Sequence, residues 1–273
     1  MDKLLLYISI FAIAIGMVNA SYVSITEPLN TTVYNGSSVQ FGNLGPGQTV
    51  YVTISSATTN QSGASLKYGW NELLVSDLPK GWIAQNSSLY NQQLSVKVTA
   101  APYAANGAYN FTLTAVNVGN YSKIGTLSFK ALVDVTPDVF QVGVSPANIS
   151  TGPGEPGLLH ITINNTGVSD SPFEISATNL PAFNLTKSVI ALHHTSESFV
   201  YPLYEDTPGQ YNVHINVTSG SSPLVSKNTD VNFIVQASLL NDYGAIGQGA
   251  PTFPVMYEPV YGIMYLISRL FNS

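Results

Sequence analysis

Hydrophobic and polar residues alternate with a period of two along much of this chain. In a β-strand, successive side chains point to opposite faces, so this alternation buries one face of a strand and exposes the other. In the first half of the chain the alternating stretches are 50–54, 94–98 and 109–113. In the second half they are 159–163, 199–203, 211–217 and 231–235. The pattern predicts an all-β protein whose strands are wetted on one face.

Several short motifs occur twice, about one hundred residues apart. Gly45-Pro46-Gly47-Gln48 returns as Gly152-Pro153-Gly154-Glu155, and Gly107-Ala108-Tyr109 returns as Gly209-Gln210-Tyr211. Asp77-Leu78-Pro79 likewise returns as Asn179-Leu180-Pro181. Because the motifs keep their order, we expect tandem domains of the same fold.

Each copy contains many short strands separated by turn signals, which is typical of an antiparallel β-sandwich. The linker between the copies is predicted at Thr136-Pro137-Asp138, a turn-forming sequence. We therefore expect sandwiches over residues 21–138 and 139–237.

The same motifs resemble the immunoglobulin-like modules of archaeal cell-surface proteins, including S-layer-associated modules of the CARDB and NEW3 types. The residues that carry the resemblance are Pro46-Gly47, the corner Leu78-Pro79-Lys80-Gly81-Trp82, and Gly107-Ala108-Tyr109. The second copy keeps most of this pattern, but Ala182-Phe183 replaces the Gly-Trp pair. The resemblance spans about residues 24–237 and implies an immunoglobulin-like fold. It supplies no catalytic residue.

The first twenty residues have the pattern of a secretory signal peptide. A charged start is followed by an apolar stretch from 4 to 18 and by Val18-Asn19-Ala20, a small-residue cleavage site. The alternative is a retained membrane anchor, but fifteen helical residues span only about 22 Å of a hydrocarbon core roughly 30 Å thick. We expect export to the cell envelope or the medium, with the mature chain starting at Ser21.

The last part of the chain differs from the two copies. Residues 238–254 are rich in Gly and Pro and are predicted to form a flexible linker, and residues 255–273 to form an apolar helix. One apolar stripe follows the helical period. It consists of Val260, Ile263, Met264, Ile267, Leu270 and Phe271. The helix is too short to span a bilayer. Docking to an envelope protein or a membrane surface is one interpretation, and folding back onto its own sandwich is the other.

Composition supports export and excludes some partners. Only 9% of the residues are charged, the net charge is −6, and the chain has no cysteine. With no basic excess, nucleic acid is not an expected partner. After residue 20, the N-glycosylation sequence Asn-X-Ser/Thr occurs ten times, against about four expected for a random order of this composition. The acceptor residues are Asn30, Asn35, Asn60, Asn86, Asn110, Asn120, Asn148, Asn164, Asn184 and Asn216.

The sequence gives no pattern for catalysis, a cofactor or a metal, and we expect none of them. It has no nucleophile elbow, metalloprotease, phosphate-loop or EF-hand motif. His193 and His194 are expected on a strand with opposite orientations, a poor chelating pair, and His160 and His214 in solvated positions. Glu205-Asp206 is interpreted as part of a turn rather than a calcium site.

Two functions remain open at this stage. The first is a non-enzymatic structural or adhesive envelope protein that joins its neighbours, including copies of itself, through sheet faces and the tail. The second is a secreted carbohydrate-binding module or an accessory part of a hydrolase, using aromatic side chains to bind glycans. For Trp82 we favour a place in the sandwich core over a carbohydrate-stacking role.

Overall fold

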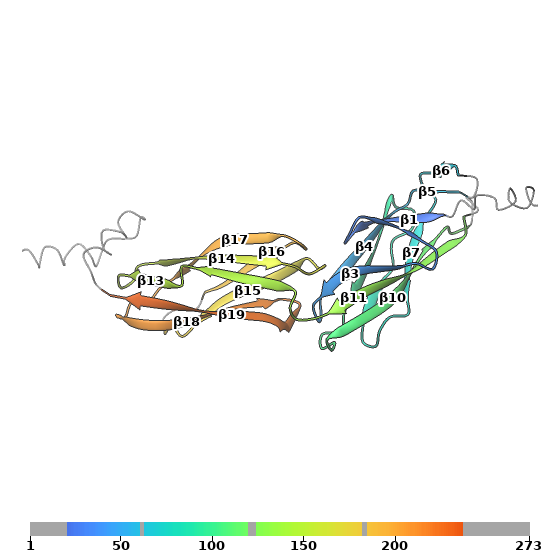
Figure 1. Cartoon of the computed structure of the whole chain (residues 1–273). Helices are drawn as coiled ribbons and strands as arrows, with labels where there is room; N and C mark the ends of the chain where they lie inside the picture. The colour runs from blue at the N-terminus through green and yellow to red at the C-terminus, as the bar shows by residue number, and fades with distance from the viewer. Residues whose placement is uncertain (1–20, 61–62, 120–123, 182–184, 237–273) are drawn as a thin grey trace, which may run out of the picture. The chain divides into compact units, whose positions relative to one another are not determined.

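The computed structural model describes residues 21–60, 63–119, 124–181 and 185–236. The described residues form two units. Unit 1 runs to Val139 and includes Gly167–Asp170, and unit 2 contains Phe140–Thr166 and continues from Ser171. All regular elements in the described ranges are β-strands, so the all-β prediction is confirmed. Figure 1 shows each unit as two layers of strands.

Unit 1 contains eleven strands. They are β1 (Tyr22–Glu27), β2 (Thr31–Tyr34), β3 (Ser38–Leu44), β4 (Thr49–Ser55), β5 (Thr58–Thr59), β6 (Ser65–Leu66), β7 (Glu72–Ser76), β8 (Ile83–Gln85), β9 (Gln93–Thr99), β10 (Gly107–Val116) and β11 (Thr126–Val135). One sheet has the order β2-β1-β4-β9-β8 and the other β3-β11-β10-β7, while β5 and β6 form a small hairpin.

Unit 2 contains eight strands. They are β12 (Phe140–Ser145), β13 (Asn148–Thr151), β14 (Gly157–Asn165), β15 (Ser171–Thr178), β16 (Thr186–Ala191), β17 (Ser196–Leu203), β18 (Gly209–Ser219) and β19 (Ser222–Val235). Its sheets have the orders β12-β14-β17 and β13-β19-β18-β15-β16.

Both units have the strand order of an immunoglobulin-like sandwich. The chain begins in one sheet and then switches to the other, where β3 pairs in parallel with β11 in unit 1 and β13 with β19 in unit 2. All other pairings are antiparallel. A cis peptide bond precedes Pro28 and Pro146, which follow the first strand of each unit. In unit 1, strands β1, β4, β8 and β9 belong to one sheet and β7, β10 and β11 to the other, which is the immunoglobulin arrangement. Unit 2 has the same arrangement, except that its fourth strand, β16, pairs with β15 in the second sheet.

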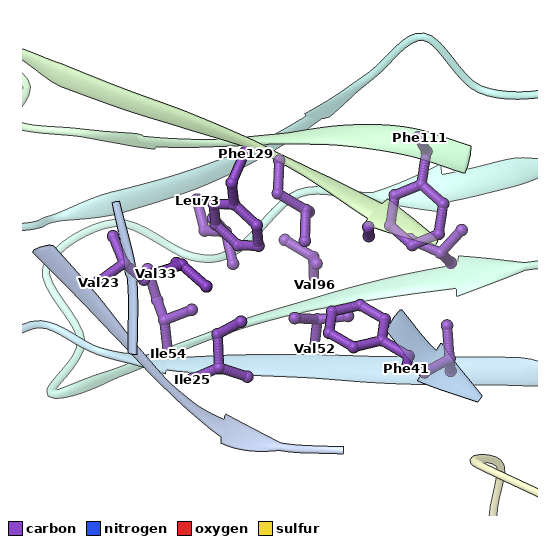
Figure 2. Close-up of a cluster of buried hydrophobic side chains, with 14 of the residues drawn as sticks. Val23, Ile25, Val33, Phe41, Val52, Ile54, Leu73, Val96, Phe111 and Phe129 are labelled. Carbon is purple, nitrogen blue, oxygen red and sulfur yellow. The ribbon is translucent and has the colours of Figure 1, made fainter. Parts of the chain in front are cut away.

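The core of unit 1 is built from the inward residues of both its sheets. Figure 2 shows Ile54 and Val52 from one layer facing Phe129, Leu73 and Phe111 from the other. All five side chains are buried. Trp82 is also buried and packs against Phe111 at 6.3 Å between ring centroids. Trp82 therefore belongs to the core, as the corner motif predicts.

The Gly-x-Tyr motif forms the same corner in both units. The Tyr109 hydroxyl donates a hydrogen bond to the carbonyl of Ala105 at 3.1 Å, and the Tyr211 hydroxyl donates to that of Thr207 at 2.8 Å. Each bond ties the start of a strand to the backbone four residues earlier. This is the tyrosine corner of immunoglobulin-like domains.

The Gly-Pro-Gly motif also forms equivalent turns. In unit 1, the Gln48 side chain accepts a hydrogen bond from the Gly45 amide at 2.8 Å. In unit 2, the Glu155 carboxylate accepts one from the Gly152 amide at 2.8 Å. A carboxylate thus replaces an amide at the same buried place. The second Glu155 oxygen, Oε1, is buried and has no hydrogen-bond partner.

Candidate functional site

The histidines of the described residues do not gather into a metal site. His193 and His194 lie in the turn between β16 and β17, so their expected place on a strand was wrong. Strand β16 ends at Ala191, and the turn is closed by a hydrogen bond from the Thr195 amide to the Leu192 carbonyl at 3.2 Å, with His194 in the left-handed conformation at φ of 56°. His160 is exposed, and His214 bonds to Asp230 across the β18–β19 pair. Within the described ranges, no three His, Cys, Asp or Glu side chains are arranged to hold a metal ion.

Glu205 and Asp206 form a turn. The Glu205 carboxylate accepts hydrogen bonds at 3.1 Å from the backbone N–H groups of both Asp206 and Thr207. The carbonyl of Glu205 also accepts a bond from the Gly154 amide at 3.0 Å. The Glu205 side chain therefore holds the chain reversal that leads into the tyrosine corner of unit 2.

Eight of the ten sequon asparagines lie in the described residues, and each reaches the surface. Asn30, Asn35, Asn86, Asn110 and Asn148 are exposed, while Asn60, Asn164 and Asn216 are half-buried. Asn120 and Asn184 lie outside the described residues. The accessible asparagines occur in both units, on strands as well as in turns.

Two sequon asparagines on long strands lie at outward positions of the buried and exposed alternation. Asn110 is exposed between half-buried Tyr109 and buried Phe111, and Asn216 is half-buried between buried Ile215 and Val217. Their side chains therefore stand on the outward faces of β10 and β18. A glycan attached at either residue extends away from the core.

Several sequon side chains are oriented by hydrogen bonds to their carbonyl oxygen. The Asn35 Oδ1 atom accepts from the Ser128 amide at 2.9 Å, and the Asn86 Oδ1 atom accepts from the Val75 amide at 3.0 Å. Asn164 Oδ1 accepts from the Ser196 hydroxyl at 3.0 Å. The glycan-accepting atom is the amide nitrogen, so these bonds hold the other atom of the amide.

An open groove of about 380 Å³ lies beside β2 and β3. Its lining includes the hydroxyl residues Thr32 and Ser37, the third positions of the sequons that begin at Asn30 and Asn35. Its walls mix apolar and polar side chains, including Val33. The groove therefore adjoins two glycan acceptor sequences on unit 1.

Aromatic side chains divide into a buried and an exposed set. Trp70 is fully buried, and its indole N–H donates to the carbonyl of Tyr22 at 2.9 Å. Both tryptophans are thus committed to the core of unit 1. The tyrosines with the most exposed rings are Tyr34, Tyr51, Tyr68, Tyr90, Tyr103 and Tyr204.

Tyr68 and Tyr90 belong to neighbouring segments of unit 1. The Gln92 amide donates to the Tyr68 hydroxyl at 3.3 Å, and the Lys67 ammonium lies 5.2 Å from the centre of the Tyr68 ring. Hydrogen bonding from Lys67, and then from Gln92, lowers the pKa of the Tyr68 hydroxyl. This grouping was missed by the sequence analysis, because turn residues carry no period that would bring the two segments together.

The predicted docking residues of the C-terminal helix lie outside the described residues, as do the signal segment and the whole predicted linker, 238–254. They are Val260, Ile263, Met264, Ile267, Leu270 and Phe271. The part of the chain that the structure describes includes no helix with the length and apolar character needed to cross a membrane.

No family model matches this chain, and no curated protein sequence does. Among solved structures, it is similar to a chimeric titin Z1Z2 that carries a decorin peptide, with 14% identity, 80% of this chain and 99% of that chain covered, and a TM-score of 0.35.

The D00-D0 domain of intimin gives 16% identity, with 78% of this chain and 99% of that chain covered, and a TM-score of 0.26. A β-glucosidase from Listeria innocua in complex with glucose gives 14% identity, coverage of 34% and 16%, and a TM-score of 0.26. TM-scores this low do not assign a fold. The immunoglobulin-like fold of the two units is identified from their strand order.

Proposed function

We propose that this chain is a non-enzymatic, glycosylated structural or adhesive protein of the cell envelope. In this proposal it is associated with an archaeal S-layer or surface appendage, and its apolar C-terminal tail holds it there. The observation that carries the proposal is the accessibility of all eight described sequon asparagines, which are distributed over both units.

The low charge of the chain supports the same proposal. A typical soluble domain has roughly 25% charged residues, and this chain has 9%. Its outward strand faces instead present hydroxyl and amide side chains, such as Thr49 and Thr99, which bond to each other at 2.7 Å. Glycans are bulky and solubilising, so they would add to the hydration of these weakly charged faces.

The fold suits a spacer or adhesive element outside the cell. The described units reach a closed, well-packed core without a disulfide, since the chain has no cysteine. Corners held by Tyr109 and Tyr211 fix the longest hairpin of each sandwich to the preceding turn. Such domains present surfaces at a fixed position and need no catalytic group.

The second candidate function, a carbohydrate-binding module, is favoured by a single observation. Trp70 and Trp82 are buried, so neither ring is available for a ligand. The favourable observation is that Tyr68 and Tyr90 are exposed beside hydrogen-bonding side chains.

Deletion after Gln248 in the native host tests the proposed anchor. We expect the parent protein in the envelope fraction and the truncated protein in the medium, because the apolar stripe is then missing. Two single substitutions form a matched pair for the same test. Ile267→Asn changes the apolar stripe, and Ser268→Asn, which changes the residue beside the stripe, is its control. The anchor is contradicted if the truncated protein remains in the envelope as fully as the parent does. A sharply lowered melting temperature after deletion would indicate that the tail packs on its own sandwich.

A further inference from the structure

We propose that Tyr68 and Tyr90 form a saccharide-binding site at one edge of unit 1, with Gln92 and Lys67 as its hydrogen-bonding groups. The inference goes beyond the envelope role and does not depend on where the protein resides. It rests on the way three loop segments are joined and on the exposure of the two rings.

Ser56 joins the segments that carry the site. Its amide donates to the carbonyl of Gln92 at 3.0 Å, and its hydroxyl donates to the carbonyl of Lys67 at 2.9 Å. Its own carbonyl accepts from the Trp70 amide at 2.9 Å. Tyr90 is tied to the same region because its amide donates to the carbonyl of Asn71 at 2.9 Å. The two tyrosines are therefore held by a common backbone network.

The two rings are exposed and differently supported. Tyr68 is 51% exposed and Tyr90 is 63% exposed. The Tyr68 hydroxyl accepts a bond from Gln92, and Lys67 lies over its ring, so this ring is oriented before any ligand arrives. A pre-oriented ring loses less conformational freedom on binding.

Tyr90 has a backbone conformation that is unfavourable for its residue type. Its φ is 61°, in the left-handed region where glycine and asparagine are favoured and a bulky residue is rare. The equivalent turn of unit 2 has His194 with φ of 56°, so the conformation belongs to the turn itself. Because the Tyr90 ring is largely exposed, packing does not offset this strain. The strain is therefore a property of the turn, and asparagine at position 90 should relieve it.

The chemistry of the site fits a pyranose better than a protein surface. A sugar ring presents C–H groups on its faces, which pack against a tyrosine ring, and hydroxyls at its edge, which bond to amide and ammonium groups. Gln92 and Lys67 supply those groups beside Tyr68. Leu89, at 48% exposure, adds a small apolar contact next to Tyr90. A specific protein partner usually buries about 800 Å² on each side, which is a larger surface than these few side chains form.

The test uses the full mature chain produced without glycans. Cellohexaose, mannohexaose, chitohexaose and a hyaluronan hexasaccharide are titrated separately by calorimetry. We expect at least one to bind, and both Tyr68→Ala and Tyr90→Asn to weaken that binding by about tenfold or more. Tyr90→Asn should also raise the melting temperature by about 2–4 °C, because asparagine tolerates the left-handed conformation. Loss of binding in a more stable variant separates ligand contact from folding.

Two variants serve as controls. Tyr103→Ala removes a tyrosine that is 79% exposed in the loop between β9 and β10, and His194→Asn relieves the equivalent turn of unit 2. Neither should change saccharide affinity. The proposal is overturned if none of the four saccharides binds, or if binding survives both tyrosine changes. Self-association that is lost in Tyr90→Asn, without saccharide binding, would mean that the site takes a protein partner and would equally overturn it.

Discussion

Gln48 and Glu155 occupy equivalent buried turns, and they differ in charge. Both side chains accept a hydrogen bond from the first glycine of their Gly-Pro-Gly motif. Glu155 is only 7% exposed, yet its Oε1 atom has no hydrogen-bond partner. An unpaired buried charge costs more free energy than an unpaired amide. We therefore expect the turn of unit 2 to be less stable with Glu155 than it would be with glutamine at that position.

Reciprocal substitutions test this difference. We expect Glu155→Gln to raise the free energy of unfolding at pH 7 by about 1 kcal/mol and Gln48→Glu to lower it by about 1–3 kcal/mol. Chemical denaturation of the full chain measures both changes. If Glu155→Gln is destabilising, the carboxylate has a favourable role that the buried turn does not reveal.

Because of Tyr201, we expect the stability of unit 2 to decrease with rising pH in the alkaline range. Burial raises the pKa of its hydroxyl to about 12, and the hydroxyl donates to the carbonyl of Leu185. The pKa in the folded state lies above the ordinary value of 10, so the contribution of the protonated Tyr201 hydroxyl to the free energy of unfolding is fully present below pH 10. It is lost as the pH rises from 10 to about 12, because the unfolded chain then releases its proton first. The full difference corresponds to about 2–3 kcal/mol.

Urea denaturation at a series of pH values measures this loss. The parent chain should lose stability between pH 10 and about 12, and Tyr201→Phe should flatten the decrease. An unchanged pH dependence in Tyr201→Phe would show that other tyrosines cause it.

The tyrosine corner operates at the level of elements, because it joins β18 to the turn that precedes it. Tyr211→Phe removes the hydroxyl that bonds to Thr207 and leaves the ring in place. We expect the free energy of unfolding to fall by about 1 kcal/mol, the usual net value of one hydrogen bond. Thermal denaturation measures the change, with Tyr103→Phe on an exposed side chain as the control. Equal melting temperatures for Tyr211→Phe and the control would mean that the corner is not stabilising.

Long strands were predictable from the sequence, and the edges of the sheets were not. β9, β10, β14, β18 and residues 231–235 of β19 have alternating burial, as their sequences predict. β4 departs from the pattern at Thr53, which is buried although its phase is polar, because its hydroxyl donates to the Glu27 carboxylate at 3.0 Å. The short strands β5, β6 and β8 carry too few residues to show a period. The parallel pairing of β3 with β11 joins residues that are far apart in sequence, for which alternation contains no information.

The candidate site was predictable in part for the same reason. Sequons are local motifs, and the outward phase of Asn110 and Asn216 follows from their strand period. The grouping of Tyr68 with Tyr90 depends on bonds made by Ser56 between loops. Loop contacts of that kind are set by tertiary structure, which no local pattern encodes.

At the scale of the whole molecule, only 9% of the residues are charged, and we propose that glycans hydrate the outer surface. The two units supply accessible acceptor asparagines on several strands and turns. The remaining acceptors and the docking stripe lie in parts of the chain outside the described residues. The central claim is therefore that the protein is glycosylated in its envelope.

Mass spectrometry of the intact protein, purified from the envelope of its native host, tests this claim most directly. We predict a mass well above that of residues 21–273, with glycopeptides that include exposed Asn110 and Asn148. A non-glycosylated protein from a bacterial expression host gives the reference mass. A native mass equal to that of the polypeptide alone would contradict the account.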